Sequence, residues 1–99
     1  MLFRSLSRSA IRVAGAKYPD VLDGTFEIVT LAGTVSPDGA HLHAALADTS
    51  GRVFGGHVAL GCRVRTTAEI LISELPGWTF SRRLDPATGY AELVIEPQT

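Results

Sequence analysis

The sequence predicts a small single domain built on a mostly antiparallel β-sheet with little helix. Its 99 residues allow one domain at most, and 45% of them are hydrophobic, which is enough to form a core. Aromatic residues make up only 7%, so this core must be mostly aliphatic. From Gly24 onward, runs of β-branched and aliphatic residues alternate with turn signals. These features together favour an antiparallel meander of five or six strands.

The first expected strand begins near Phe26. Residues 26–31 are rich in β-forming side chains, and residues 33–35 extend the run. The strand should end at a Ser-Pro-Asp-Gly turn, in which Pro37 presets φ and Gly39 accepts a positive φ.

A hairpin is expected next. Residues 41–47 alternate, with apolar side chains at the even positions and two histidines among the odd ones. Residues 48–51 form a turn signal, and residues 52–58 begin another strand. The two strands should therefore pair with each other.

The longest alternating run covers residues 62–73. Its β-branched content favours a strand, although a helix over residues 67–75 is also compatible with the pattern. Residues 78–80 continue in β style, residues 85–89 read as a turn, and residues 90–95 form the final expected strand.

Residues 1–23 differ from the rest and are expected to form a basic N-terminal segment that is only partly ordered. The segment is rich in arginine and serine and has no acidic residue before Asp20. This composition is typical of an organellar transit peptide, but also of a short terminus whose basic residues are simply solvated. The solvated terminus is the interpretation that we favour.

Composition excludes several classes of protein. The formal net charge of −1 gives no overall attraction to nucleic acid or to a membrane. A single cysteine, Cys62, excludes an internal disulfide framework and suits a reducing compartment. No apolar run approaches the ~20 residues that span a bilayer. We therefore expect a cytoplasmic protein.

The three histidines are the strongest candidates for chemistry, because all of them lie within 17 residues. His41 and His43 are two apart, so on a strand both side chains leave the same face. His57 follows two glycines, where the backbone can approach a neighbour closely. This pattern predicts a three-nitrogen site for a divalent metal, and zinc is the metal that it favours most. The alternative is three polar histidines that bind nothing. Cys62 is a possible fourth ligand, but it lies on the apolar phase of its run, which favours a buried hydrophobic role.

Four motifs carry a resemblance to a known family. They are GTFEIVTLAGTV at residues 24–35, HLHA at 41–44, GRVFGGH at 51–57 and TTAEI at 66–70. In this order and spacing they resemble the PPC (plants and prokaryotes conserved) domain, which is found beside AT-hooks in plant nuclear proteins and alone in prokaryotes. The resemblance covers roughly residues 24–93. It implies a compact α/β (α+β) unit that has a mostly antiparallel sheet and assembles as a homotrimer.

The resemblance also sets domain boundaries and candidate interface residues. The PPC-like domain is expected over residues 24–96. Family members have a further strand and helix before the first motif, and 23 residues are too few for these, so the chain resembles an N-terminally shortened member. The first motif implies partner contacts through Phe26 and Glu27. The second face of the long run carries polar residues that we also expect at the interface, namely Arg63, Arg65 and Glu69.

Three classes of function follow. The resemblance and the lack of a catalytic constellation favour a self-assembling interaction module, with a metal-sensing protein or a metal-dependent enzyme second. A DNA-binding protein is the third class, but it is implied only by the family. The AT-hook that reads the minor groove in the plant proteins is absent, so specific DNA binding is not expected. No nucleophile pair, phosphate loop or four-ligand zinc spacing is present, which favours binding over catalysis. Glu69 is the nearest candidate for an acid–base partner of the histidines.

Overall fold

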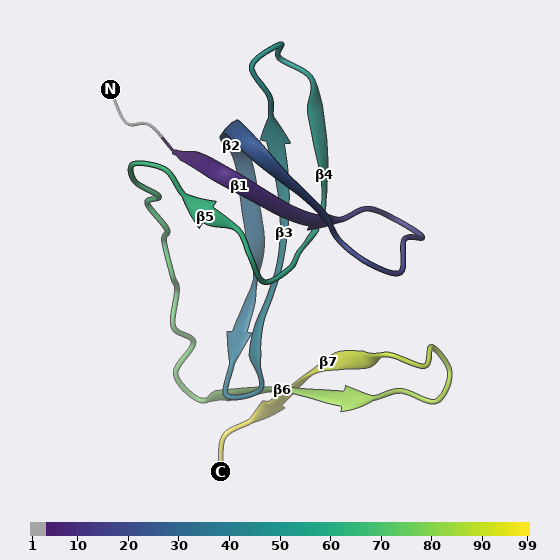
Figure 1. Cartoon of the computed structure of the whole chain (residues 1–99). Coiled ribbons are helices and arrows are strands. Elements are labelled where there is room, and N and C mark those ends of the chain that lie inside the picture. Colours follow the sequence, from purple (N-terminus) through teal and green to yellow (C-terminus); the bar gives the residue numbers. More distant parts are fainter. Residues whose placement is uncertain (1–3) are drawn as a thin grey trace. The chain divides into compact units, whose positions relative to one another are not determined.

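The computed structural model describes residues 4–99, whose strands are labelled in Figure 1. These residues contain no helix, and hence none that could cross a membrane. They divide into two compact units. The first comprises the residues up to Gly33 together with His41–Ile70, and the second comprises Thr34–Ala40 and Leu71–Thr99. The strands are β1 (Ser5–Arg12), β2 (Asp20–Ser36), β3 (Gly39–Ala47), β4 (Val53–Val58), β5 (Arg63–Val64), β6 (Trp78–Leu84) and β7 (Ala91–Pro97).

The first unit is organised around β1, which is paired along both edges. One edge pairs with β2, where Arg8 lies opposite Asp23. The other edge is shared: Ile11 lies opposite Val58 of β4, and Leu6 lies opposite a residue of β5. The strand order is β2-β3-β4-β1-β5, and the additional β1–β2 pairing closes the sheet on itself. These pairs of strands are antiparallel, as the sequence predicts.

The core of the first unit lies inside this closed sheet. The rings of Phe26 and Phe54 meet edge to face, with 5.7 Å between their centroids. Leu46 is fully buried and Ala44 nearly so, which confirms the predicted apolar face of β3. The buried cluster consists of Leu6, Ile11, Phe26, Ala44 and Leu46.

The predicted hairpin is present as β3 and β4. The Asp48 carboxylate accepts hydrogen bonds from the Ser50 backbone N–H at 2.9 Å, the Ser50 hydroxyl at 2.7 Å and the Arg52 backbone N–H at 2.9 Å. These bonds fix the tight turn, because an aspartate side chain can replace a backbone acceptor there. Ala44 then lies opposite Gly56, and Leu46 lies opposite Phe54.

The N-terminal segment corrects an expectation. Residues 5–12, which the sequence placed in a partly ordered segment outside the domain, form β1, and the expected boundary at residue 24 falls inside β2. The small side chains of Ser9 and Ala10 are completely buried, so β1 can be packed on both faces. Its arginines lie on less buried positions, and Arg8 pairs with Asp23. The basic residues Arg8 and Arg12 thus occupy the less buried positions of a central strand.

The long strand expected over residues 62–73 is wrong in extent, since only Arg63–Val64 is a strand. Apolar and polar side chains do alternate at the start of this run, but a strand also needs a neighbouring strand with free backbone N–H and C=O groups. β4 occupies the C-terminal part of the edge of β1, and only the stretch around Leu6 and Arg8 remains for β5. Figure 1 shows the chain continuing after β5 as a coil.

The second unit contains the β6–β7 hairpin and the turn between β2 and β3. Phe80 lies opposite Ile95 in the antiparallel pair, which confirms β structure at both expected places. The Asp38 carboxylate in the β2–β3 turn accepts a hydrogen bond from the Arg82 backbone N–H at 2.9 Å. The Arg82 guanidinium also donates to the Thr34 hydroxyl at 2.9 Å. Two polar contacts therefore tie this turn to β6.

Candidate metal site

The three histidines come together on one face of the β3–β4 hairpin. His43 of β3 lies directly opposite His57 of β4, and His41 precedes His43 by two residues. Residues directly opposite each other, or two apart on one strand, project from the same face. One ligand nitrogen from each imidazole can be chosen so that all of these atoms lie within 4.8 Å of one another. Among the described residues, no other group of three or more possible metal ligands comes together in this way.

The imidazole rings pack against each other. The centroids of His41 and His43 are 5.4 Å apart in a stacked arrangement. The His57 ring stands edge-on to both, at 5.0 Å from His41 and 5.6 Å from His43. The three rings therefore converge from two directions onto one small volume, as three ligands of a single ion must.

The two glycines before His57 set the position of β4. A Cβ on Gly55 would collide with the carbonyl oxygen of Ala44 on β3, and a Cβ on Gly56 would collide with the carbonyl oxygen of Arg12 on β1. Both neighbours are backbone atoms, which cannot swing aside. Only glycine therefore lets β4 lie this close to both neighbours, and this close approach places His57 beside His43.

Burial and the neighbouring positive charges favour the neutral form of His57, which is the form that binds metals. Burial lowers the pKa of His57, and the positive charges of His41, Arg12 and His43 lower it further. A neutral imidazole has a lone pair for a cation, whereas an imidazolium has none. The Nδ1 atom of His57 is also buried without a hydrogen-bond partner. Such an unsatisfied polar atom is costly unless a ligand engages this ring.

This donor set fits zinc. Many four-coordinate zinc sites have three imidazole nitrogens as their protein ligands, which leaves one coordination position open. Tetrahedral bonds of 2.0–2.1 Å place ligand nitrogens about 3.3 Å apart, so the present spacing needs only small side-chain rotations. The half-buried positions of His41 and His57 and the exposed position of His43 leave access from one side.

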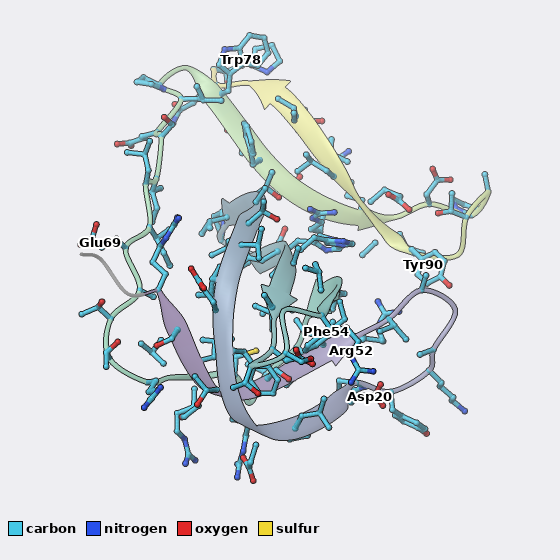
Figure 2. The ribbon with its side chains drawn as sticks, turned by 90° about the horizontal axis from the view of Figure 1, so that it is seen from above. Asp20, Arg52, Phe54, Glu69, Trp78 and Tyr90 are labelled. Atoms are coloured by element: carbon cyan, nitrogen blue, oxygen red, sulfur yellow. The ribbon has the colours of Figure 1, made fainter. Side chains whose placement is uncertain are left out.

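Two other predicted participants lie outside the cluster. The Cys62 thiol contacts backbone instead: it accepts from the Ala10 N–H at 3.3 Å and donates to the Ala10 carbonyl at 3.6 Å. Cys62 also packs against the core, as its apolar phase predicts. Glu69 lies on the coil after β5 (Figure 2). It does not belong to the histidine group.

The expected interface residues lie in different environments. Phe26 is buried in the core of the first unit. Glu27, Arg63, Arg65 and Glu69 are exposed. Arg65 donates to the Thr25 hydroxyl at 3.4 Å.

Sequence reasoning missed Arg12 as a neighbour of the site. Arg12 of β1 lies directly opposite His57 of β4. No local pattern could have shown this, because the two residues meet only through a pairing between distant parts of the chain.

Comparison with known proteins places the chain in a family. Residues 5–76 match the Plants and Prokaryotes Conserved (PCC) domain, so the matched region begins before Gly24 and ends before Glu96. The chain is also similar to two curated proteins named bifunctional protein GlmU. It is 46% identical over 93 residues to that of Synechococcus sp. (strain JA-2-3B'a(2-13)) and 48% identical over 92 residues to that of Synechococcus sp. (strain JA-3-3Ab). These matches cover 94% and 93% of this chain but only 15% of each relative.

A solved structure is similar over nearly the whole chain. It is that of a hypothetical protein from Salmonella cholerae-suis (Salmonella enterica), with 45% sequence identity and a TM-score of 0.93. The similarity covers 98% of this chain and 70% of the Salmonella chain. The strands and the histidine motifs described above, together with the match over residues 5–76, therefore show that the chain belongs to the Plants and Prokaryotes Conserved (PCC) domain family.

Proposed function

We propose that this chain is a divalent-metal-binding domain whose ligands are His41, His43 and His57. The observation that carries the proposal is the convergence of three imidazole nitrogens within 4.8 Å on one face of a hairpin. The hairpin is held in register by the Asp48 turn and by the close approach of β4 to its neighbours. The ligands are thus preorganised on strands rather than on loops.

Zinc is the metal that this set favours, because it accepts imidazole nitrogen in tetrahedral geometry. When bound, it would act as a Lewis acid toward whatever occupies its fourth position. The chain's own contribution would be to hold three neutral imidazoles and to leave that position accessible from the side of His43.

Metal content and calorimetric titration test this proposal. The protein must carry no polyhistidine tag, and the matched variants are H41A/H43A and C62S. We expect about one zinc per wild-type chain, one per C62S chain and none in H41A/H43A. Zinc at a hundred times its Kd should stabilise the wild-type fold by about 2.7 kcal/mol, and a chelator should reverse this. Equal zinc binding by wild type and H41A/H43A would refute the proposal.

We also propose that the chain assembles with copies of itself, as a homotrimer. The specific support is the coil after β5, where apolar side chains lie in solvent: Ile70 is 59% exposed, Leu71 94% and Ile72 72%. Consecutive large apolar residues on an extended segment are a common feature of interaction surfaces. Glu27, Arg63, Arg65 and Glu69 would then supply polar contacts between subunits.

Light scattering after size-exclusion chromatography tests the assembly. Three chains of 10.5 kDa should elute as one particle at micromolar concentration. The variant I70D/L71D should shift the particle toward a monomer, because charges would have to be buried at the interface. L60D is the matched control, since Leu60 is 99% exposed but lies in the turn between β4 and β5. A wild-type monomer would rule out this second proposal.

The similarity to part of the GlmU proteins supports a modular role. Since the chain spans 15% of their length, we do not extend to it the bifunctional activity of those proteins. We infer that the domain is an accessory unit, which adds a metal site and self-association to whichever chain carries it.

A further inference from the structure

Arg12 lies in one row with two of the histidines. Arg12 of β1 is directly opposite His57 of β4, and His57 is directly opposite His43 of β3. Directly opposite residues of antiparallel strands have Cβ atoms about 4.5–5.5 Å apart and share a face. The Arg12 side chain therefore leaves the same face of the sheet as the imidazoles. Its Cα lies on the strand next to the one that carries His57.

No carboxylate of the described residues neutralises this guanidinium. Arg8, Arg52 and Arg83 each have a carboxylate partner within 4.0 Å. Within residues 4–99, Arg12 has no such ion pair, and its Nη1 donates a hydrogen bond to the carbonyl oxygen of Ala16 at 3.4 Å. Arg12 is half-buried, and its charge acts on His57. The other donors of its planar fork are therefore free for a ligand on the histidine face.

We propose that Arg12 and the metal together form a binding site for a small oxyanion, which gives one oxygen to the metal and another to the guanidinium. The inference rests on the proposed metal site. Its ligand class is a carboxylate or a phosphate, which share the two-oxygen geometry that a guanidinium recognises.

Charge supports an anion over a neutral ligand. Three neutral imidazoles leave the full charge of a divalent ion uncompensated, and Arg12 adds another positive charge. Among the described residues, the metal-ligand cluster consists of His41, His43 and His57 and contains no carboxylate. A metal site without an anionic protein ligand gains most from an anionic exogenous one.

Cobalt(II) spectroscopy on the full chain tests the inference. Cobalt(II) replaces zinc in such sites and reports the ligand in its open position through its visible absorption. Cobalt-loaded wild type, R12Q, R12K and R52Q are each titrated with acetate, inorganic phosphate and chloride at constant ionic strength. R52Q is the charge-matched control, because the Arg52 side chain is exposed and pairs with Asp48 at the turn end of the β3–β4 hairpin, whereas His43 and His57 lie opposite each other at the other end.

We expect acetate, phosphate or both to change the cobalt spectrum of wild type and R52Q with equal Kd. R12Q should weaken that binding about tenfold or more, because a charge-assisted hydrogen bond to the anion is lost. The Kd of R12K for the oxyanion should lie between those of wild type and R12Q. If R12Q does not fold, R12K is compared with wild type in its place. Chloride should be affected less, since a single atom cannot bridge the metal and the guanidinium. Whichever oxyanion binds identifies the carboxylate or the phosphate as the ligand class.

Three results would overturn the inference. If R12Q and R12K bind the oxyanions as tightly as wild type does, Arg12 takes no part. If cobalt binds but neither oxyanion alters its spectrum, the oxyanion site does not exist while the metal site stands. If no cobalt spectrum develops at all, the proposed metal function fails together with this inference.

Discussion

The hydroxyl of Ser9 is a local defect in the core of the first unit. Its Oγ is completely buried and has no hydrogen-bond partner. A buried unsatisfied hydroxyl destabilises a fold, because it loses water and gains nothing in return. Ser5 on the same strand differs, since its hydroxyl lies 3.4 Å from that of Thr66.

Ser9→Ala is therefore expected to stabilise the protein. The substitution removes the unsatisfied group and leaves a methyl in a tight site, so the free energy of unfolding should rise by about 1 kcal/mol. Ser5→Ala is the matched control and should not raise it. Urea denaturation of the two variants measures both changes, and a less stable S9A would mean that the hydroxyl has a partner.

The ion pair between Arg8 and Asp23 gives the stability a dependence on pH. The guanidinium donates two hydrogen bonds to the carboxylate, at 2.6 and 3.3 Å. These bonds, and then the charge of Arg8, lower the pKa of Asp23 below its ordinary value of 3.8. Since the folded pKa is lower than the unfolded one, the pair contributes stability above pH 3.8 and loses it as the pH falls through the folded pKa.

Arg8→Gln should therefore lower the melting temperature at pH 6, and the difference from wild type should shrink below pH 3.8. The effect should be small and sensitive to salt, because both side chains are accessible to water. Asp23→Asn should have the same pH profile as R8Q. A difference from wild type that is constant down to pH 2 would contradict this assignment.

At the scale of elements, the glycine pair couples the site to the sheet. Gly55→Ala would place a methyl against the carbonyl of Ala44 and force β4 away from β3. Overpacking of this kind costs about 1–3 kcal/mol, and it should also weaken metal binding because His57 moves with β4. Titration with zinc and thermal melting measure the two effects.

Gly89→Ala is the matched control for this variant. Gly89 has a φ of 77° and open space around it, so an added methyl strains the backbone without touching β4. G89A should lose stability but keep the zinc affinity of wild type. If G89A lost zinc affinity and G55A kept it, the proposed link between Gly55 and the position of His57 would be wrong.

The elements differ in how well the sequence predicts them, and the reason is the range of the interactions. The β3–β4 hairpin could be predicted because its turn chemistry and alternation are local, and so could the convergence of His43 and His57. β1 could not, since Ser9 and Ala10 are small residues whose burial depends on partners around residues 20–27 and 57–64. The length of β5 could not be predicted from the sequence either, because β5 can pair only with the part of the β1 edge that β4 does not occupy. Arg12 entered the site through the same long-range pairing.

For the whole molecule, weak binding to DNA is expected. The net charge is −1, and Asp23 neutralises Arg8, which lies opposite Arg63 in the β1–β5 pair. Affinity for duplex DNA scales with the number of phosphates that are neutralised, so retention on a duplex column should disappear at moderate salt. Gel-shift titrations with unrelated duplexes at about 150 mM salt measure this. Tight, sequence-dependent binding under those conditions would contradict the prediction.

The pairing of β1 on both edges has a consequence for how the chain folds. β3 and β4 are joined by a short turn and can pair as soon as both exist, and one edge of β1 can pair with β2. The other edge of β1 must wait for β4 and β5, far along the chain. Closing such a long loop costs entropy before any contact repays it, and a high share of non-local contacts slows folding. β1 precedes all of its partners along the chain and is thus the last strand of the first unit to be enclosed on both edges. Until then Leu6 and Ile11 lack their cover, and this interval is where the nascent protein is most exposed to aggregation.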